Sequence, residues 1–480
     1  MRLSDHGDVA AAVERRDCFS SRTDRAFTGA DANWKDGFPA VQAATLKSSA
    51  DKSAPRFEFG HSAKTLAFWR NLAARAARSH PTPFYLFSAE PIREALAELD
   101  VLDDALPVRH WLSCKTQPVR PLLHWWRQQG RGIEVVSEFE LLAALKEGFL
   151  PEQILVNGPA KHHWLARHSI RGLSVNFDSL REIDALLPSA KSLDWRVGIR
   201  CLTCEEFDPE SSSLPTQFGL EPESAAMALR RLKAAGARIE MAHFHLRTNV
   251  RSAAIYERAI REVAKICRAA NWTPKFLDCG GGLPPPHTQS RKGSAYASQF
   301  DLTQLTGVYR KAAELFPGLE EIWLENGRFL TGRSGVLVVK VVDVKERRGL
   351  RQLICDGGRT THALISNWEA HGLLVLPPRQ GLRCSTAVCG PTCMAFDQLT
   401  RRPLPRSIRE GDRLIWMDAG AYHMPWETRF SHGLAAVLWH ESGQLTVARR
   451  AESFDAWWGQ WSGITIPVSS EREPACRSEA

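Results

Sequence analysis

The sequence of 480 residues lacks any apolar run of about 18 residues, the length that a helix needs to span a bilayer. Its N-terminal sequence, MRLSDHGDVAAAVERRD, also lacks the apolar stretch of a secretory signal. The 11 cysteines are odd in number and scattered, which does not resemble a disulfide framework. We therefore expect a soluble protein of a reducing compartment, located in the cytoplasm and without a membrane partner.

Blocks of like charge are missing as well. Lys and Arg total 62 and Asp and Glu total 54, so the formal net charge of +8 is modest and spread along the chain. This distribution gives no indication of nucleic-acid binding, and we expect no nucleic-acid partner. Hydrophobic residues make up 44% of the sequence, which is enough for a large core and excludes a chain disordered throughout.

Several common catalytic motifs are absent. No GxSxG, HExxH, Walker A or suitably placed GxGxxG element occurs, which disfavours a serine hydrolase, zinc protease, nucleotide hydrolase or dinucleotide enzyme. Cys201 and Cys204 form one CxxC without a second pair, which makes a zinc site improbable. His243 and His245 point to one face of a predicted strand, but no third ligand with suitable spacing follows. We expect packing or stacking roles for them and no bound metal.

Short apolar runs alternate with segments of helical period from about residue 109 onward. Eight runs fit this pattern: 111–115, 133–136, 154–157, 173–177, 196–199, 241–245, 275–279 and 322–325. Helix candidates lie between them, such as SEFELLAALKEG and AAIYERAIREVAKICRAA. Buried strands alternating with helices indicate an α/β fold with a parallel sheet, and eight units favour a closed (β/α)8 TIM-like barrel. The alternative is a doubly wound α/β fold.

After Gly335 the sequence contains β-rich segments with few helical patterns between them. Segments such as GVLVVKVVDVK, STAVC and AAVLWH predict a C-terminal all-β domain. We therefore predict a partly ordered N-terminal extension (1–80) with a helix around 65–78, a barrel domain (81–333) that includes a strand at 82–88, a β-rich domain (334–467) and a tail (468–480).

Chemically distinctive residues lie at the C-terminal ends of the predicted barrel strands, where the active sites of such barrels are found. They are Lys115, Glu134, Asn157, Arg200, His245, the triplet Gly280–Gly282, Glu325 and Arg328. A glycine triplet can bring backbone N–H groups to a phosphate, although a tight turn is an equal alternative. A lysine in apolar surroundings can lose its proton at neutral pH and form a Schiff base, although a solvated lysine is the commoner case. A carboxylate can keep a pyridine nitrogen protonated, so the set as a whole suits pyridoxal phosphate.

The order of these segments resembles a known family. SCKTQP, GRGIEVVSEFELLAALKEG, VNGPAK, VNFDSL, RVGIR, HFHLRTN, LDCGGGLP, LENGR, CDGG, CGPTC and DAGAY occur in the order found in the pyridoxal-phosphate decarboxylases of the alanine-racemase fold, the diaminopimelate and ornithine decarboxylase group. The resemblance runs from about Thr82 to Ala451. It implies an alanine-racemase-like fold, pyridoxal 5'-phosphate as cofactor, an amino-acid substrate, and a homodimer with active sites at its interface.

The resemblance also assigns roles. It places the cofactor on Lys115, stacks His245 on the ring, pairs Glu325 with the pyridine nitrogen, and makes Cys393 a proton donor across the dimer interface. Cys384 and Cys389 lack a His/Cys complement in the sequence, so we expect them to be ordinary thiols. The catalytic residues would be Lys115, Cys393 and His245. The cofactor-binding residues would be Lys115, Glu134, Arg200, His245, Thr248, Gly280, Gly281, Gly282, Glu325, Gly327, Arg328 and Tyr422.

The departures from the family pattern bear on the substrate. Arg247 replaces the family's glycine, Gln217 stands where lysine is common, and Met394 follows Cys393 where enzymes for diamino substrates have an acid. An amine-binding aspartate of the ornithine enzymes falls near Trp368, beside Glu369.

A free distal ammonium would therefore be poorly compensated. We expect a modified or larger amino acid, as in siderophore or secondary-metabolite pathways, with Arg247 or Arg359 receiving a distal carboxylate or acyl group. The substrate-binding residues would be Arg247, Arg359, Trp368 and Met394. The alternatives are a racemase or epimerase of the same fold, and a catalytically silent homologue that binds a protein partner; the CGPTC segment favours decarboxylation.

Overall fold

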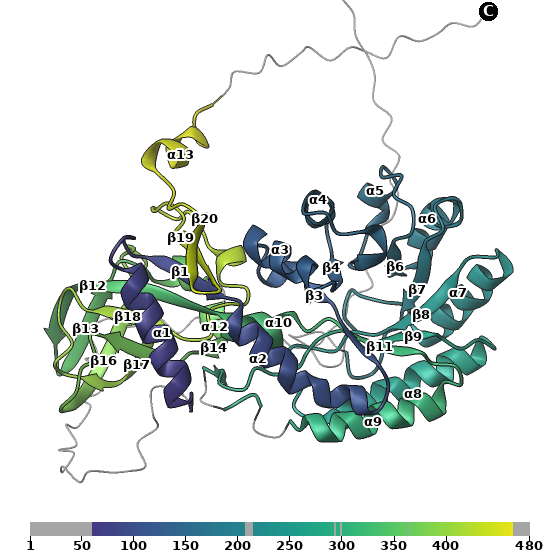
Figure 1. Ribbon diagram of the computed structural model, residues 1–480, viewed down its shortest axis with the longest axis horizontal. Coiled ribbons are helices and arrows are strands. Elements are labelled where there is room, and N and C mark those ends of the chain that lie inside the picture. Colours follow the sequence, from purple (N-terminus) through teal and green to yellow (C-terminus); the bar gives the residue numbers. More distant parts are fainter. Residues whose placement is uncertain (1–59, 207–214, 292–293, 298–299, 364, 464–480) are drawn as a thin grey trace, which may run out of the picture. The chain divides into compact units, whose positions relative to one another are not determined.

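The computed structural model describes residues 60–206, 215–291, 294–297, 300–363 and 365–463 (Figure 1). Most of the predicted N-terminal extension and the whole tail after residue 467 lie outside these residues. Within the described part of the chain, no helix is long and apolar enough to cross a membrane.

A parallel sheet forms the barrel. Its nine strands run in the order β2-β11-β9-β8-β7-β6-β5-β4-β3, and β2 and β3 are two pieces of one strand interrupted at Trp111. Because β2 pairs with β11 and β3 pairs with β4, the interrupted strand closes the ring, which confirms the predicted (β/α)8 barrel. The strands are β2 (Val108–His110), β3 (Leu112–Ser113), β4 (Ile133–Val135), β5 (Ile154–Val156), β6 (Ser174–Phe177), β7 (Arg196–Arg200), β8 (Ile239–His243), β9 (Phe276–Asp278) and β11 (Glu321–Leu324).

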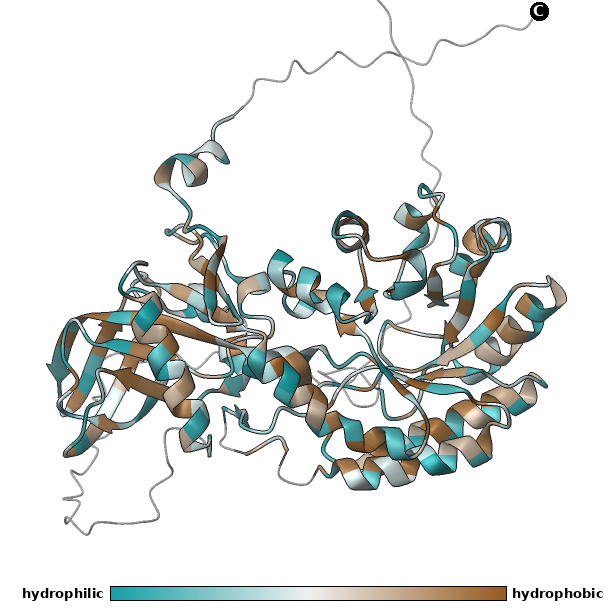
Figure 2. Cartoon of the chain, in the orientation of Figure 1, coloured by the Kyte–Doolittle hydropathy of each residue, from teal (hydrophilic) through white to brown (hydrophobic). Residues whose placement is uncertain are grey.

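Helices connect and cover these strands. They are α2 (Glu90–Leu99), α3 (Arg120–Gln128), α4 (Glu138–Lys146), α5 (His162–Leu165), α6 (Leu180–Ser192), α7 (Pro222–Ala234), α8 (Ala253–Ala269), α9 (Leu302–Leu315) and α10 (Gly327–Thr331). Ser137, Ser179, Ser252 and Asp301 cap the starts of α4, α6, α8 and α9, because each side chain accepts a backbone N–H from the first turn. The sheet strands carry mostly hydrophobic residues, whereas hydrophilic residues occupy part of each surface helix (Figure 2).

The β domain is a mixed nine-stranded sheet, which confirms the predicted second part of the fold. Its main path is β17-β16-β13-β12-β1-β19-β20, and β18 joins β12 to β15. The strands are β1 (Phe84–Ser88), β12 (Gly335–Arg347), β13 (Leu350–Cys355), β15 (Leu373–Leu376), β16 (Arg383–Cys389), β17 (Gln398–Pro405), β18 (Arg413–Trp416), β19 (Ala436–Glu441) and β20 (Gln444–Arg449). The remaining helices are α1 (Ala63–Ala76), α11 (Arg359–His362), α12 (Ile365–Trp368) and α13 (Phe454–Gly459).

The first strand lies in a different sheet from the one expected. We placed the strand at 82–88 in the barrel domain, but β1 pairs antiparallel with β12 and parallel with β19. All five of its residues are buried, because barrel-side and domain-side residues cover its two faces. Helix α1 covers the same region, where Trp69 and Leu72 pack with Phe84 and Leu86. The β domain is therefore assembled from both ends of the chain.

A second link joins the two parts of the fold. Strand β10 (Gln289–Ser290), in the loop that follows the glycine triplet, pairs with β14 (Glu369–Ala370) of the β domain. Arg291 strengthens this contact, because its backbone N–H donates to the Trp368 carbonyl at 2.8 Å. The mouth of the barrel is thus joined directly to segment 365–371.

Candidate active site

Lys115 lies in a short 3-10 turn (Cys114–Thr116) directly after β3, at the carboxyl end of the barrel. Its Nζ donates to Oε1 and Oε2 of Glu134 at 2.9 and 2.8 Å. Ser113 Oγ donates to the same carboxylate at 2.6 Å. Glu134, on β4, is buried, whereas the Lys115 side chain keeps 32% of its surface exposed and faces the barrel mouth.

The structure decides the charge state of Lys115, which the sequence left open. An apolar strand end could let this lysine lose its proton at neutral pH. Burial does act in that direction, but the carboxylates of Glu134 and Glu325 outweigh it and raise the pKa of Lys115 above its usual value. The free protein therefore holds Lys115 as an ammonium ion paired with Glu134.

Glu325 is the buried carboxylate at the end of β11, and three side chains point to it. His245 Nδ1 lies 3.1 Å from Oε2, His243 Nε2 lies 3.3 Å from Oε1, and Asn157 Nδ2 donates to Oε1 at 2.6 Å. Burial opposes ionisation, but the hydrogen bonds from His243 and His245 hold the pKa of Glu325 well below its usual value. Glu325 is therefore a buried anion in the centre of the barrel mouth.

The two histidines do have a third potential ligand, which corrects the sequence analysis. The ligand atoms of His243, His245 and Glu325 all lie within 4.8 Å of one another. Sequence spacing could not show this, because Glu325 is 80 residues from His245 along the chain. Burial lowers the pKa of His243 to about 4, so this imidazole is neutral at physiological pH.

A buried polar network that was not predicted from the sequence connects Glu325 to Asp278 through two asparagines. Asn176 Nδ2 donates to Asn157 Oδ1 at 3.0 Å and to Asp278 Oδ2 at 2.9 Å. The Gly280 N–H donates to Asp278 Oδ1 at 3.1 Å. Burial and the charge of Glu325 raise the pKa of Asp278 well above its usual value. The signal in the sequence was a polar residue next to the last position of two largely apolar runs, Asn176 in LSVNF and Asp278 in KFLDC.

The glycine triplet is tightly enclosed after β9. A Cβ on Gly280 would lie 2.7 Å from His245 Nδ1, and one on Gly281 would lie 2.7 Å from the Glu325 carbonyl oxygen. Gly280 and Gly282 have φ values of +62° and +99°, which side chains rarely tolerate. The triplet therefore brings bare backbone close to the His245–Glu325 pair.

A cavity of about 750 Å³ opens beside these residues. It is lined by Arg247, Thr248, Asn249, Arg251, Tyr296, Arg328, Trp368, Glu369 and Trp426. Arg328 Nη1 donates to Glu369 Oε1, and its guanidinium lies 4.7 Å from the centroid of the Tyr422 ring. Because Trp368, Glu369 and Trp426 come from the β domain, both parts of the fold build this cavity.

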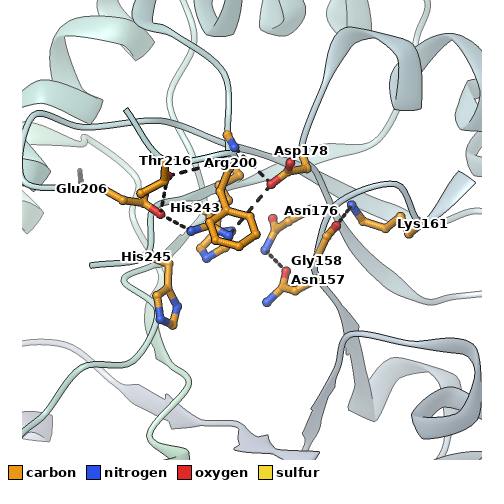
Figure 3. Close-up of polar contacts among 12 residues, drawn as sticks. Asn157, Gly158, Lys161, Asn176, Asp178, Arg200, Glu206, Thr216, His243 and His245 are labelled. Atoms are coloured by element: carbon orange, nitrogen blue, oxygen red, sulfur yellow. Dashed lines mark hydrogen bonds and ion pairs between the residues drawn. The ribbon is translucent and has the colours of Figure 1, made fainter. Parts of the chain in front are cut away.

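Arg200 is occupied by acidic neighbours at the end of β7. It forms ion pairs with Glu206 and with Asp178, and its guanidinium lies 4.5 Å from the centroid of the Phe218 ring. Figure 3 shows this group next to His243 and His245, with Asn176 and Asn157 on the other side. Arg200 is thus brought to the barrel mouth, but its charge is already compensated.

Three residues of the β domain that were predicted for catalysis or substrate binding, Cys393, Met394 and Arg359, are not in the cavity lining. Cys393 and Met394 lie between β16 and β17; the Cys393 thiol is exposed, and Cys384 and Cys389 are also free thiols. Arg359 donates to Asn367 Oδ1 and approaches the Phe396 ring. Within one chain, Arg247 and Trp368 are the predicted substrate residues that line the cavity.

The Glu134→Gln variant tests the cause of the Lys115 pKa shift. Loss of the carboxylate charge removes the strongest opposition to deprotonation, so the pKa of Lys115 should fall. Competitive labelling with acetic anhydride across pH, read by mass spectrometry, measures this pKa, and exposed Lys64 serves as internal standard in each sample. An unchanged Lys115 profile would contradict the assignment.

Comparison with known proteins identifies the family. Residues 93–332 match the family model described as pyridoxal-dependent decarboxylase, pyridoxal binding domain. A diaminopimelate decarboxylase from Deinococcus radiodurans is 28% identical over 403 residues, covering 81% of this chain and 98% of that protein. One from Helicobacter pylori is 25% identical over 400 residues, covering 79% of this chain and 96% of that protein.

Solved structures agree with the fold. The structure of H. pylori diaminopimelate decarboxylase complexed with L-lysine has a TM-score of 0.70 at 23% identity, covering 81% of this chain and 99% of that one. A lysine/ornithine decarboxylase from Vibrio vulnificus, complexed with cadaverine, has a TM-score of 0.66 at 20% identity, covering 79% of this chain and all of that one. The family match spans half of the sequence and contains the whole barrel mouth. The chain therefore belongs to the pyridoxal-dependent decarboxylases, enzymes that use pyridoxal phosphate to remove the carboxyl group of an amino acid.

Proposed function

We propose that this enzyme decarboxylates a modified or non-standard amino acid whose side chain does not end in an ammonium group. The observation that carries the proposal is the charge of the cavity. Three arginines line it, and Glu369 is the one acid among its described lining residues. Because Glu369 already pairs with Arg328 and lies 3.5 Å from His371, no lining carboxylate is left to neutralise a distal ammonium.

The residues of the barrel mouth fit pyridoxal phosphate. The glycine triplet leaves no space for side chains, as expected of a backbone cradle for a phosphate. Glu325 is held as an anion, as a partner of a protonated pyridine nitrogen must be. Lys115 provides the primary amine at the same mouth. When bound, the cofactor accepts the electron pair that decarboxylation leaves on Cα.

Each side chain then has a role. Lys115 would carry the cofactor, and Glu134, in contact with Nζ, would take up the proton that this nitrogen loses. Thr248, Arg328 and Tyr422 would contact the phosphate together with Gly280, Gly281 and Gly282. His245 would lie against the ring.

Gly327 and Arg200, two further predicted cofactor-binding residues, would position neighbouring segments of the site. A Cβ on Gly327 would lie 2.3 Å from Thr116, so this glycine lets α10 approach the turn that holds Lys115. Arg200, compensated by Glu206 and Asp178, would support the end of β7 next to the histidines.

The position of Arg247 supports a distal carboxylate or acyl group in the substrate. Arg247 is exposed at the cavity, next to Thr248, and Arg251 lines the same wall. Trp368, Trp426 and Tyr296 add aromatic surface for a larger side chain. The relatives carry the name diaminopimelate decarboxylase, but Met394 stands where enzymes for diamino substrates have an acid, and the amine-binding aspartate of the ornithine enzymes falls near Trp368, beside Glu369. We therefore place the reaction in siderophore or secondary-metabolite synthesis.

A homodimer would complete the site. Cys393 and Met394 are on the β domain but not in the cavity lining of their own chain. We propose that a second copy brings its Cys393 to the cavity, where the thiol returns a proton to Cα. Arg359, close to the same turn, would approach the substrate in this way too. The described cysteines are all free thiols, which supports placing the enzyme in the reducing cytoplasm.

Release of CO2 tests the substrate proposal. We expect amino acids with a distal carboxylate or acyl group to be converted to amines, with kcat/KM at least about 100-fold higher than for diaminopimelate, lysine or ornithine. Lys115→Ala is the inactive control. Product analysis separates decarboxylation from racemisation, because a racemase returns an inverted amino acid. Efficient turnover of diaminopimelate would overturn the proposed substrate class.

Mixed dimers test the proposed interface. Lys115→Ala and Cys393→Ala homodimers should each be nearly inactive. When the two are mixed and allowed to exchange, half of the dimers contain one intact site if both residues serve the same site across the interface. Activity should then return to about one quarter of the wild-type value. Mixtures that stay inactive after proven subunit exchange would place both residues in the same chain's site.

Gly281→Ala tests the phosphate cradle. The added Cβ would meet the Glu325 carbonyl oxygen at 2.7 Å and force the two segments apart, so affinity for pyridoxal phosphate should fall by about tenfold or more. Gly307→Ala is the matched control, because a Cβ on this helical glycine meets nothing within 4 Å. Equal affinities of the two variants, measured by equilibrium dialysis, would count against the cradle.

A further inference from the structure

His61, which precedes α1, is buried next to the segment that carries Tyr422. Its Nε2 lies 2.9 Å from Asp418 Oδ2, and the two side chains retain only 2% and 4% of their surface. The His61 ring also contacts His287, with ring centroids 4.2 Å apart. Asp418 belongs to the β domain and His287 to the loop after the glycine triplet. One side chain from the N-terminal region therefore touches two segments that build the active site.

The start of α1 fixes the position of His61. The next residue, Ser62, caps the helix, because its Oγ accepts the Thr65 N–H at 3.0 Å. Further along the helix, Trp69, Leu72 and Ala73 are buried in the cluster that contains β1 and β12. His61 is thus anchored to the β domain by a packed helix.

Asp418 begins a segment that is held by backbone hydrogen bonds at three of its next four residues. The Ala419 N–H donates to the Gly335 carbonyl at 2.8 Å, and the Gly420 N–H donates to the Gly332 carbonyl at 2.9 Å. The Tyr422 N–H donates to the carbonyl of Thr116, the neighbour of Lys115, at 2.9 Å. The segment therefore determines where the Tyr422 ring lies against Arg328.

The backbone of segment 418–422 adopts two unfavourable conformations that contacts with other segments must stabilise. Asp418 and Tyr422 have φ values of +55° and +66°, in the left-handed region that costs residues with side chains about 1 kcal/mol or more. Burial disfavours the charge of Asp418, but interaction with His61 helps to hold the pKa of Asp418 below its usual value. The His61 contact thus stabilises both the charge and the place of Asp418.

We propose that His61 is a positioning residue of the active site, acting through Asp418 on segment 418–422 and through His287 on the loop after the glycine triplet. His61 lies outside the family match, which begins at residue 93. The region before the barrel would thereby belong to the working enzyme. The effect on catalysis rests on the proposed function, whereas the effect on segment 418–422 does not.

Hydrogen exchange of the full-length protein tests the structural part. In His61→Ala, amides of residues 416–423 and 283–291 should exchange about tenfold faster or more, while the barrel strands stay unchanged. His61→Gln, which keeps a side-chain N–H for Asp418, should restore most of the protection. Lys64→Ala is the matched control, because this side chain is 86% exposed and pairs only with surface Glu94 among the described residues.

Two results would overturn the proposal. One is equal exchange in His61→Ala and Lys64→Ala. The other is faster exchange spread evenly over the barrel, because this would show general destabilisation and not positioning. Asp418→Asn provides a further check, since the double variant His61→Ala/Asp418→Asn should exchange no faster than His61→Ala if the two residues act together.

Kinetics test the catalytic part. With a substrate that the wild-type enzyme turns over, His61→Ala should lower kcat about tenfold and change KM much less, because Tyr422, a proposed phosphate contact, is displaced while Arg247, a proposed substrate contact, stays in place. Unchanged kcat together with faster exchange of residues 416–423 would overturn the catalytic part of the proposal and leave His61 a purely structural role. If the wild-type protein releases no CO2 from any amino acid, the proposed function fails, and the exchange data still decide the structural link.

Discussion

The buried charge of Glu325 is the constraint on which the barrel mouth depends. A carboxylate in this position is costly unless its oxygens are satisfied, and His243, His245 and Asn157 satisfy them. The same anion, after Glu134, helps to keep Lys115 protonated, and it adds to the burial that raises the pKa of Asp278, so both neighbours favour their protonated forms. The asparagines between Glu325 and Asp278 carry this influence to Gly280. The charge of Glu325 and the backbone position of Gly280 are therefore linked through one hydrogen-bond network.

Neither part of the fold makes the site alone. The barrel supplies Lys115, the histidines and the glycine triplet, whereas the β domain supplies the acid and the aromatic ring that enclose Arg328. Pairing of β10 with β14 fixes the distance between these contributions. Among the described lining residues of the cavity, three arginines outnumber the one acid, Glu369, which is already paired with Arg328.

Much of the barrel and of the site could be predicted from sequence because the signals are local. Buried strands read as apolar runs, and the polar residues near the carboxyl ends of these runs mark the barrel mouth, which is how Lys115, Glu134 and Glu325 were found. The features that the sequence could not decide depend on residues far away along the chain. The place of Phe84–Ser88 is decided by β19, some 350 positions later; the charge of Lys115 is decided by Glu134 and Glu325; and Glu325 completes the histidine pair across 80 residues. Only the folded chain shows that Arg328 captures Glu369 or that His61 reaches Asp418.

The position of β1 between β12 and β19 has a consequence for synthesis. When the ribosome has released the whole barrel, β1 has emerged long before its parallel neighbour, because β19 ends at Glu441. Until then one edge of β1 exposes unpaired backbone groups, as unfinished sheets do. Strand β19 thus completes the sheet around β1 only after the barrel has been synthesised. A chain truncated before β19 would retain an open edge on β1 that is prone to association.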